Sequence, residues 1–382
     1  MHIGADRIMK VGIVYRLDHP GGMQSCALSL VKGLNRRGII PDILWDVEPD
    51  WSFFKRSGIE ARYRHLKFPV SSLVMDRLPS TLRFLAGLAN ILSGDRYGTD
   101  YGFLYIFYNG FLVTNGTPHL RYVAGPPLLP QLEIIRPGVA GIPFRTSLWL
   151  YQNFLRKVSP AYELHPGNNY VTISQFIANL FQEAYKVDLP VISPSIEMAE
   201  RHFDFTDLKD RDTLTFFSRF ADYKRPELVL DLAEQHLDMR CVMMGGVPPH
   251  RRPYFEALQK QAKDRELDKV VFLARPSDLQ IKEELARTRF YVFPAINEHF
   301  GMTTAEAIAS GAIPYVHDSG GQKEIVNDPR LRFEDLEFFD KFDALMNCPE
   351  MELNQIRKAL SIHIQQYSED VFIEKMLSYI DC

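Results

Sequence analysis

The chain has 382 residues, 46% of them hydrophobic, and a formal net charge of −4. The chain is longer than the number of residues that usually fold around a single hydrophobic core, so its length predicts two domains. The charge argues against a nucleic-acid-binding protein, which would carry a basic excess. The cysteines are scattered without a CxxC pair, so we expect free thiols in a reducing compartment. They are Cys26, Cys241, Cys348 and Cys382.

The first ten residues lack an apolar run, which argues against a signal peptide. The most apolar stretch, residues 103–113, is short and interrupted by Asn109-Gly110, so it predicts a strand and a turn rather than a membrane span. We therefore expect a cytoplasmic protein that at most rests on the cytoplasmic membrane as a peripheral protein.

The first half of the sequence alternates strand-like and helix-like segments, which is typical of a doubly wound parallel sheet. An apolar run at 10–15 ends at Asp18-His19-Pro20-Gly21-Gly22, and the apolar stripe after it predicts a helix over 23–37. Further strands are predicted at 41–47, 104–107, 120–123 and 170–173, and a further helix at 175–185.

The alternation lapses between residues 126 and 166, where several prolines occur and aromatic residues gather over 144–154. This stretch is either a mobile, apolar lip of an acceptor site or an ordinary packed insertion. Both interpretations stay open at this point.

A stretch rich in prolines and then charges at 189–212 predicts a hinge, and a second alternating series follows. Its strands are predicted at 213–217, 239–244, 270–273, 290–293 and 313–317, and its helices at 226–236, 281–288, 304–310 and 352–380. The predicted fold class is α/β, with two Rossmann-like domains facing each other across a deep cleft. We place the domains at 1–195 and 196–365, with a final helical segment, 366–382, crossing back to the first.

The most informative stretch is residues 293–326, FPAINEHFGMTTAEAIASGAIPYVHDSGGQKEIV. After a strand that ends at Pro294, Glu298 precedes the turn His299-Phe300-Gly301, which leads directly into a helix. Because the start of a helix presents unpaired N–H groups, this turn suits a diphosphate. Glu298, and Glu306 in the expected first helical turn, could accept hydrogen bonds from sugar hydroxyls on either side of it.

Glu306 has a second interpretation, because Thr303-Thr304-Ala305-Glu306 matches a capping box in which the glutamate satisfies a backbone donor. Glu298 has no such alternative. An acidic residue at the carboxyl end of a strand is typical of a ligand site.

Basic residues follow the first strand of the second half. Arg219 and Lys224 could neutralise a leaving diphosphate, the arginine as a fork and the lysine as a point charge. The alternative is a solvated, charged turn before a helix. In the first half, Gly21-Gly22 before a helix forms either a second phosphate-sized nest or a plain tight turn.

Together these motifs resemble the donor-site signature of family-4-type retaining glycosyltransferases, also called glycosyl transferases group 1. The signature here consists of Glu298-x7-Glu306, Phe300-Gly301, Glu306-Ala307, Gly311, Pro314 and Gly320-Gly321. EHFG…EAIASGAIP…HDSGG is especially similar to the oligosaccharide-building mannosyltransferases of this group. The resemblance covers most of the second half and extends to Phe217-Ser218-Arg219, Lys224, Gly21-Gly22 and Ile173-Ser174-Gln175-Phe176. It implies the GT-B fold.

The resemblance also implies roles for individual residues. Glu298 would hold hydroxyls of the donor sugar, and Arg219 and Lys224 would stabilise the leaving diphosphate; these three are the predicted catalytic residues. Glu306 would bind the ribose, Arg275 would lie near the base, and Gly21-Gly22 would close over the phosphate from the other domain. The full predicted donor-binding set is Gly21, Gly22, Arg275, Phe300, Gly301, Met302, Thr303 and Glu306.

One position departs from the family pattern. Many members have a histidine in a Tyr-x-His-x-Pro pattern, and the matching stretch Tyr122-Val123-Ala124-Gly125-Pro126 has Ala124 there. Either His119 or another group serves instead, or this chain works without the histidine. Because that histidine is thought to touch the donor sugar, the departure bears on sugar preference more than on activity.

The predicted function is therefore a retaining, metal-independent hexosyltransferase of polysaccharide or glycolipid biosynthesis that uses front-face displacement. No Asp-x-Asp stands at a strand end to bind a metal, so we expect no cofactor. The expected partners are a nucleotide-diphosphate sugar, with a UDP-sugar such as UDP-glucose favoured, and a saccharide or lipid-linked acceptor. A catalytically silent binding subunit and a nucleotide-sugar epimerase on the same fold are the alternatives.

Overall fold

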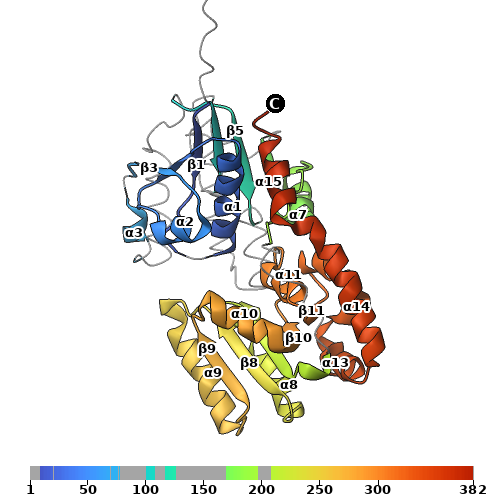
Figure 1. Ribbon diagram of the computed structural model, residues 1–382. Helices are drawn as coiled ribbons and strands as arrows, with labels where there is room; N and C mark the ends of the chain where they lie inside the picture. The colour runs from blue at the N-terminus through green and yellow to red at the C-terminus, as the bar shows by residue number, and fades with distance from the viewer. Residues whose placement is uncertain are drawn as a thin grey trace, which may run out of the picture. The chain divides into compact units, whose positions relative to one another are not determined.

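The computed structural model describes residues 9–19, 21–68, 70–75, 77, 100–107, 117–125, 169–196 and 208–381. The chain divides into two compact units. Each unit contains a parallel sheet with six strands among these residues (Figure 1). Unit 1 runs to Ser195 and includes Glu369–Cys382 from the end of the chain, whereas unit 2 contains Ile196–Ser368.

The sheet of unit 1 has the strand order β3-β2-β1-β4-β5-β6. Its strands are β1 Val11–Val14, β2 Asp42–Trp45, β3 Arg62–His65, β4 Phe103–Ile106, β5 His119–Val123 and β6 Tyr170–Thr172. Among the described residues of unit 1, the helices are α1 Gly22–Arg36, α2 Trp51–Ser57, α3 Ser72–Met75, α7 Gln175–Tyr185 and α15 Glu369–Leu377. Every residue of β1, β2 and β4 is buried. Continuous apolar runs are typical of such central parallel strands.

Helix α15 returns from the end of the sequence and packs along α1 (Figure 1). The close approach depends on Gly33 of α1, because a Cβ atom there would lie 2.4 Å from Cγ2 of Ile373. Tyr105 in β4 donates a hydrogen bond of 2.9 Å to the carbonyl of Met376. The last helix is therefore part of the core of unit 1.

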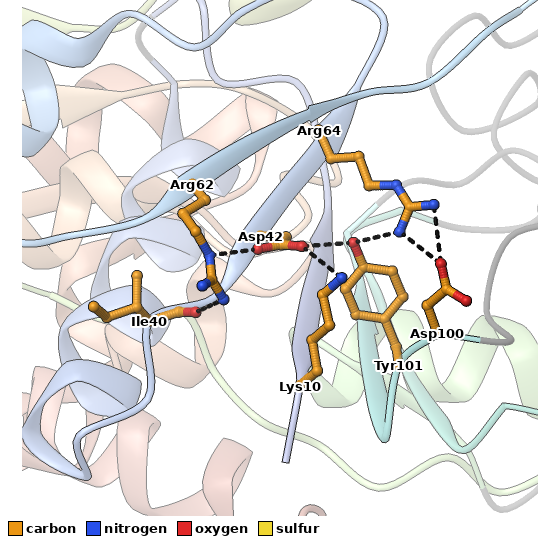
Figure 2. Close-up of polar contacts among 7 residues, drawn as sticks. All are labelled: Lys10, Ile40, Asp42, Arg62, Arg64, Asp100 and Tyr101. Carbon is orange, nitrogen blue, oxygen red and sulfur yellow. Dashed lines mark hydrogen bonds and ion pairs between the residues drawn. The ribbon is translucent and has the colours of Figure 1, made fainter. Parts of the chain in front are cut away.

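A polar cluster occupies the amino end of this sheet (Figure 2). Asp42, at the start of β2, accepts hydrogen bonds from Arg62 at 2.9 Å and from the Tyr101 hydroxyl at 2.8 Å, and Lys10 lies 3.3 Å from it. Arg64 pairs with Asp100 at 3.2 Å. Since ligands of open α/β sheets bind at the carboxyl ends of the strands, this cluster fixes neighbouring strands rather than forming the site.

The sheet of unit 2 has the strand order β12-β11-β10-β7-β8-β9. Its strands are β7 Thr213–Phe217, β8 Arg240–Gly245, β9 Val270–Ala274, β10 Thr288–Phe293, β11 Ile313–His317 and β12 Arg332–Phe333. Its helices are α8 Glu227–Gln235, α9 Arg252–Asp264, α10 Asp278–Arg287, α11 Met302–Ala309, α12 Gln322–Ile325, α13 Phe338–Met346 and α14 Glu350–His363. The predicted pair of Rossmann-like sheets is confirmed.

Two groups of details differ from the sequence-based expectations. The tail expected to be helical over 352–380 consists of two helices, because a 3-10 turn, Ile364–Tyr367, separates α14 from α15 where the chain returns to unit 1. Helices α2, α3, α9, α12 and α13 and the edge strands β3 and β12 were not predicted. Pro126, the stretch to residue 166 with its aromatic segment, and hinge residues 197–207 lie outside the described residues. No helix in the described ranges is both long and apolar enough to cross a membrane.

Candidate functional site

The predicted catalytic residues of unit 2 stand on loops at one edge of its sheet. Strand β10 pairs in parallel with β7 on one side and β11 on the other. The loops that follow these three strands therefore emerge side by side at the carboxyl edge, where ligands of this sheet type bind. They carry Arg219 and Lys224 after β7, Glu298 after β10, and Gly320-Gly321 after β11.

Lys224 and Glu298 form an ion pair in these loops. The lysine Nζ contacts Oε2 of the glutamate, and their side chains are 11% and 18% exposed. Burial raises the pKa of Glu298, but the charge and hydrogen bond of Lys224 outweigh it and hold the pKa below its ordinary value. Lys224 Nζ also lies 5.2 Å from the ring centroids of Tyr223 and Phe293. The site thus offers a cation and a carboxylate at one place.

The two glycines after β11 hold the backbone of Glu298. A Cβ atom at Gly320, whose φ is +70°, would lie 2.4 Å from the carbonyl oxygen of Glu298. A Cβ atom at Gly321 would lie 2.2 Å from the carbonyl oxygen of His299. The Gly321 amide donates a hydrogen bond of 2.7 Å to the Glu298 carbonyl. In this structure the glycine pair packs against the loop that carries Glu298.

Helix α11 begins directly after that loop, with Gly301 as N-cap at φ +106° and no side-chain capping bond. The capping-box interpretation of Glu306 is therefore wrong, and so is its place in the first turn. Because the helix starts at Met302, Glu306 lies in the second turn. The first helical bond runs from the Thr304 amide to the Gly301 carbonyl, so the amides of Met302 and Thr303 precede it and suit an anion.

Phe300 and Tyr291 fix the surroundings of this helix start. Phe300 is 2% exposed and packs edge-on against Tyr367, so only its backbone can contribute to a site. The Tyr291 hydroxyl donates to the Phe217 carbonyl at 3.2 Å and lies 2.7 Å from the Thr303 hydroxyl. Because the Tyr291 hydroxyl has one proton and donates it to Phe217, the Thr303 hydroxyl is the donor in the bond between Thr303 and Tyr291. Sequence reasoning missed Tyr291, which reads as an ordinary buried residue of a strand.

Arg219 and Arg275 are both exposed. Arg219 makes no hydrogen bond or ion pair with any residue that the structure describes, whereas Arg275 donates to the Val247 carbonyl at 3.3 Å. The loop of Arg219 lies against Gly245, where a Cβ atom would be 1.7 Å from the Ser218 carbonyl oxygen. Gly245 was also missed, because nothing in the sequence shows how close that backbone comes.

The remaining predicted residues are in unit 1. Gly21 is the N-cap of α1 and Gly22 its first residue, and no side chain caps this helix start. Their role toward a phosphate stays a prediction. Ala124 follows the carboxyl end of β5, whereas His119 begins that strand, contacts the Thr117 carbonyl at 2.9 Å and touches Asn169. His119 therefore lies at the wrong end of β5 to replace the family histidine.

Residues 198–359 match the family model of glycosyl transferases group 1. The resemblance predicted from the sequence motifs is therefore confirmed over this segment. The chain is 25% identical over 228 residues to the GDP-Man:Man(3)GlcNAc(2)-PP-Dol alpha-1,2-mannosyltransferase of Dictyostelium discoideum, covering 53% of this chain and 44% of the relative. It is 30% identical over 145 residues to the lipopolysaccharide core biosynthesis mannosyltransferase LpcC of Rhizobium leguminosarum bv. viciae, covering 37% and 40%. The chain thus spans less than half the length of these relatives.

Several solved structures share the fold over nearly the whole chain. Anabaena Alr3699/HepE in complex with UDP and glucose superposes with a TM-score of 0.69 at 14% identity, covering 98% of this chain and 99% of that one. Sucrose-phosphate synthase from Thermosynechococcus elongatus gives 0.68 at 14% identity, covering 96% and 97%. The expected GT-B fold, with its two Rossmann-like domains, is confirmed.

Proposed function

We propose that this chain is a retaining glycosyltransferase that moves a hexose from a nucleoside-diphosphate sugar to a hydroxyl of a saccharide or lipid-linked saccharide. The bond between the anomeric carbon and the diphosphate breaks, and a bond to the acceptor oxygen forms on the same face. The proton of the acceptor hydroxyl leaves with the diphosphate. The observation that carries the proposal is the partly buried Lys224–Glu298 pair beside the uncapped start of α11, within the segment that matches the family.

Each part of this arrangement suits one part of the donor. The amides of Met302 and Thr303 and the exposed guanidinium of Arg219 would bind the phosphates, and Lys224 would meet the charge that develops on the leaving oxygen. Glu298, whose lowered pKa keeps it ionised at neutral pH, would accept hydrogen bonds from sugar hydroxyls. Glu306 and Arg275 are the proposed contacts to ribose and base.

We also propose that these cations take the place of a divalent metal, and that a uridine diphosphate sugar is the preferred donor. The D. discoideum relative is named for GDP-Man, whereas the Anabaena structure contains UDP. Guanosine donors are therefore the first competitors to test.

The experiment is mass-spectrometric turnover of the purified protein with uridine-, guanosine-, adenosine- and thymidine-diphosphate sugars, with and without a chelator. We expect slow release of one nucleoside diphosphate that survives the chelator and falls on the order of 10²-fold in Glu298→Ala. Binding without turnover would favour the silent subunit. An isomerised sugar still attached to the nucleotide would favour the epimerase, and dependence on added manganese would contradict the metal-independent mechanism.

A further inference from the structure

A chain of polar contacts supports the residue immediately before Glu298. Asn297 has a left-handed backbone, with φ +53°. Its amide donates at 2.8 Å to the hydroxyl of Ser319, in the loop after β11. The Ser319 hydroxyl also lies 2.8 Å from Nδ1 of His317, the last residue of β11. A non-glycine residue in this conformation is strained, so its geometry depends on such partners.

The hydrogen bonds in this chain allow one continuous arrangement of its protons. The Ser319 oxygen accepts the Asn297 amide, and the hydroxyl proton can then go to Nδ1 of His317. In this arrangement Nδ1 accepts the proton, and the ring proton of the neutral histidine is on Nε2. Nε2 lies 3.4 Å from Oδ1 of Asp335, an acceptor suited to that proton.

We propose that His317 and Ser319 are positioning residues for Glu298: neutral His317 orients the Ser319 hydroxyl, which holds the strained Asn297 and so keeps the Glu298 carboxylate against Lys224. This inference rests on the proposed function for its catalytic consequence. It assigns the pair a role through the backbone, with no contact to the substrate. Protonation of His317 removes the acceptor for the Ser319 proton and loosens the loop.

The surroundings of His317 determine when this happens. Burial lowers the pKa of His317 most, Arg225 lowers it further, and the carboxylates of Asp335, Asp318 and Glu334 oppose them; the result lies below the ordinary value of 6.5. The ring is therefore neutral at pH 7 and becomes protonated as the pH falls through that lowered pKa. Activity should be lost in this acidic range and retained above it.

The test compares three variants in turnover across pH 5 to 8. Ser319→Ala should lower kcat about 10-fold at pH 7 with a melting temperature within about 4 °C of the parent. His317→Asn keeps an acceptor for the Ser319 proton and has no titrating ring, so it should keep kcat within about threefold at pH 7 and lose the acidic decline. The control is Ser361→Ala, whose hydroxyl bonds only the nearby Lys358 carbonyl at 2.8 Å among the described residues; its kcat and pH profile should match the parent.

A second measurement does not depend on turnover. Amide hydrogen exchange in the segment 294–301 should be faster in Ser319→Ala than in the parent. In the parent, exchange of this segment at pH 5 should also be faster than the intrinsic pH dependence of amide exchange accounts for. His317→Asn should not show this additional exchange at pH 5. Unchanged exchange in Ser319→Ala, or an acidic decline of kcat that persists in His317→Asn, would overturn the inference. A protein that shows the exchange differences but turns over no donor would instead contradict the proposed function.

Discussion

At the scale of single residues, the site depends on glycines whose missing side chains let loops lie against backbone. Gly320 and Gly321 make room for the loop of Glu298, and Gly245 makes room for the loop of Arg219. Any Cβ atom at these positions would meet main-chain atoms, which cannot move aside as the end of a side chain can. The loops that present the charged groups are thus set by close backbone contacts.

Gly245→Ala tests this dependence. Its φ of +147° is unfavourable for alanine, and the added carbon would lie 1.7 Å from the Ser218 carbonyl oxygen. We expect a loss of about 1–3 kcal/mol in unfolding free energy from backbone strain, and on the order of 10²-fold in kcat/KM because Arg219 is displaced.

Gly246→Ala is the matched control, because its added carbon would lie 3.6 Å from Cγ of Arg219, an ordinary contact. Its stability and turnover should stay close to the parent. Equal effects of the two substitutions, measured by urea unfolding and by initial rates, would contradict the role given to Gly245.

The sequence identified the charged residues of the site but not their pairing. Lys224 and Glu298 each stood out at the end of a predicted strand, yet they are 74 positions apart, and only the pairing of β7 with β10 brings them together. Gly245 and Tyr291 could not be found at all. Gly245 matters because the backbone of Ser218 lies against it, and Tyr291 matters because its hydroxyl contacts two loops. Neither feature leaves a local sequence pattern.

At the scale of elements, periodicity predicted the buried strands and the amphipathic helices, because burial on one face or on both leaves a regular apolar pattern. It failed where that pattern is absent. Strand β3 has the sequence RYRH with no fully buried residue, since it lies at the sheet edge. The break between α14 and α15 contains no proline or glycine, and it reflects the return of the chain to unit 1.

The pairing of α1 with α15 can be tested through Gly33. Gly33→Val should push against Ile373, whose Cγ2 would lie 2.4 Å from the new Cβ, and lower the unfolding free energy by about 1–3 kcal/mol. Adding Ile373→Ala removes the obstructing atoms, so the double variant should recover part of the loss relative to the sum of the single changes. Strictly additive losses in thermal unfolding would show that these two positions do not touch.

At the scale of the whole molecule, the family match and the fold likeness differ in extent. The family model covers residues 198–359, which lie largely in unit 2, whereas the solved structures superpose over nearly the full chain. In unit 1, helix α1 contacts the two residues at which the chain leaves and re-enters this unit, Ser195 and Glu369. Ser29 on α1 is bonded to Ser195 at 2.9 Å and to Glu369 at 3.0 Å. The residues proposed to contact the donor in the reaction lie in unit 2.

We propose that the Lys224–Glu298 pair serves the reaction rather than the stability of unit 2. The chain provides a matched ion pair in Arg240 and Glu284, at the amino end of β8, with side chains 28% and 14% exposed and a hydrogen bond of 2.8 Å. Lys224→Met removes the cation of the first pair, and Arg240→Met removes the cation of the second. Both substitutions should lower the melting temperature by similar amounts.

The most direct measurement is kcat of these two variants with the best donor. We expect a loss on the order of 10²-fold or more in Lys224→Met and parent-like turnover in Arg240→Met. Equal turnover in the two variants, with equal losses of stability, would show that Lys224 only stabilises the fold and has no role in the reaction.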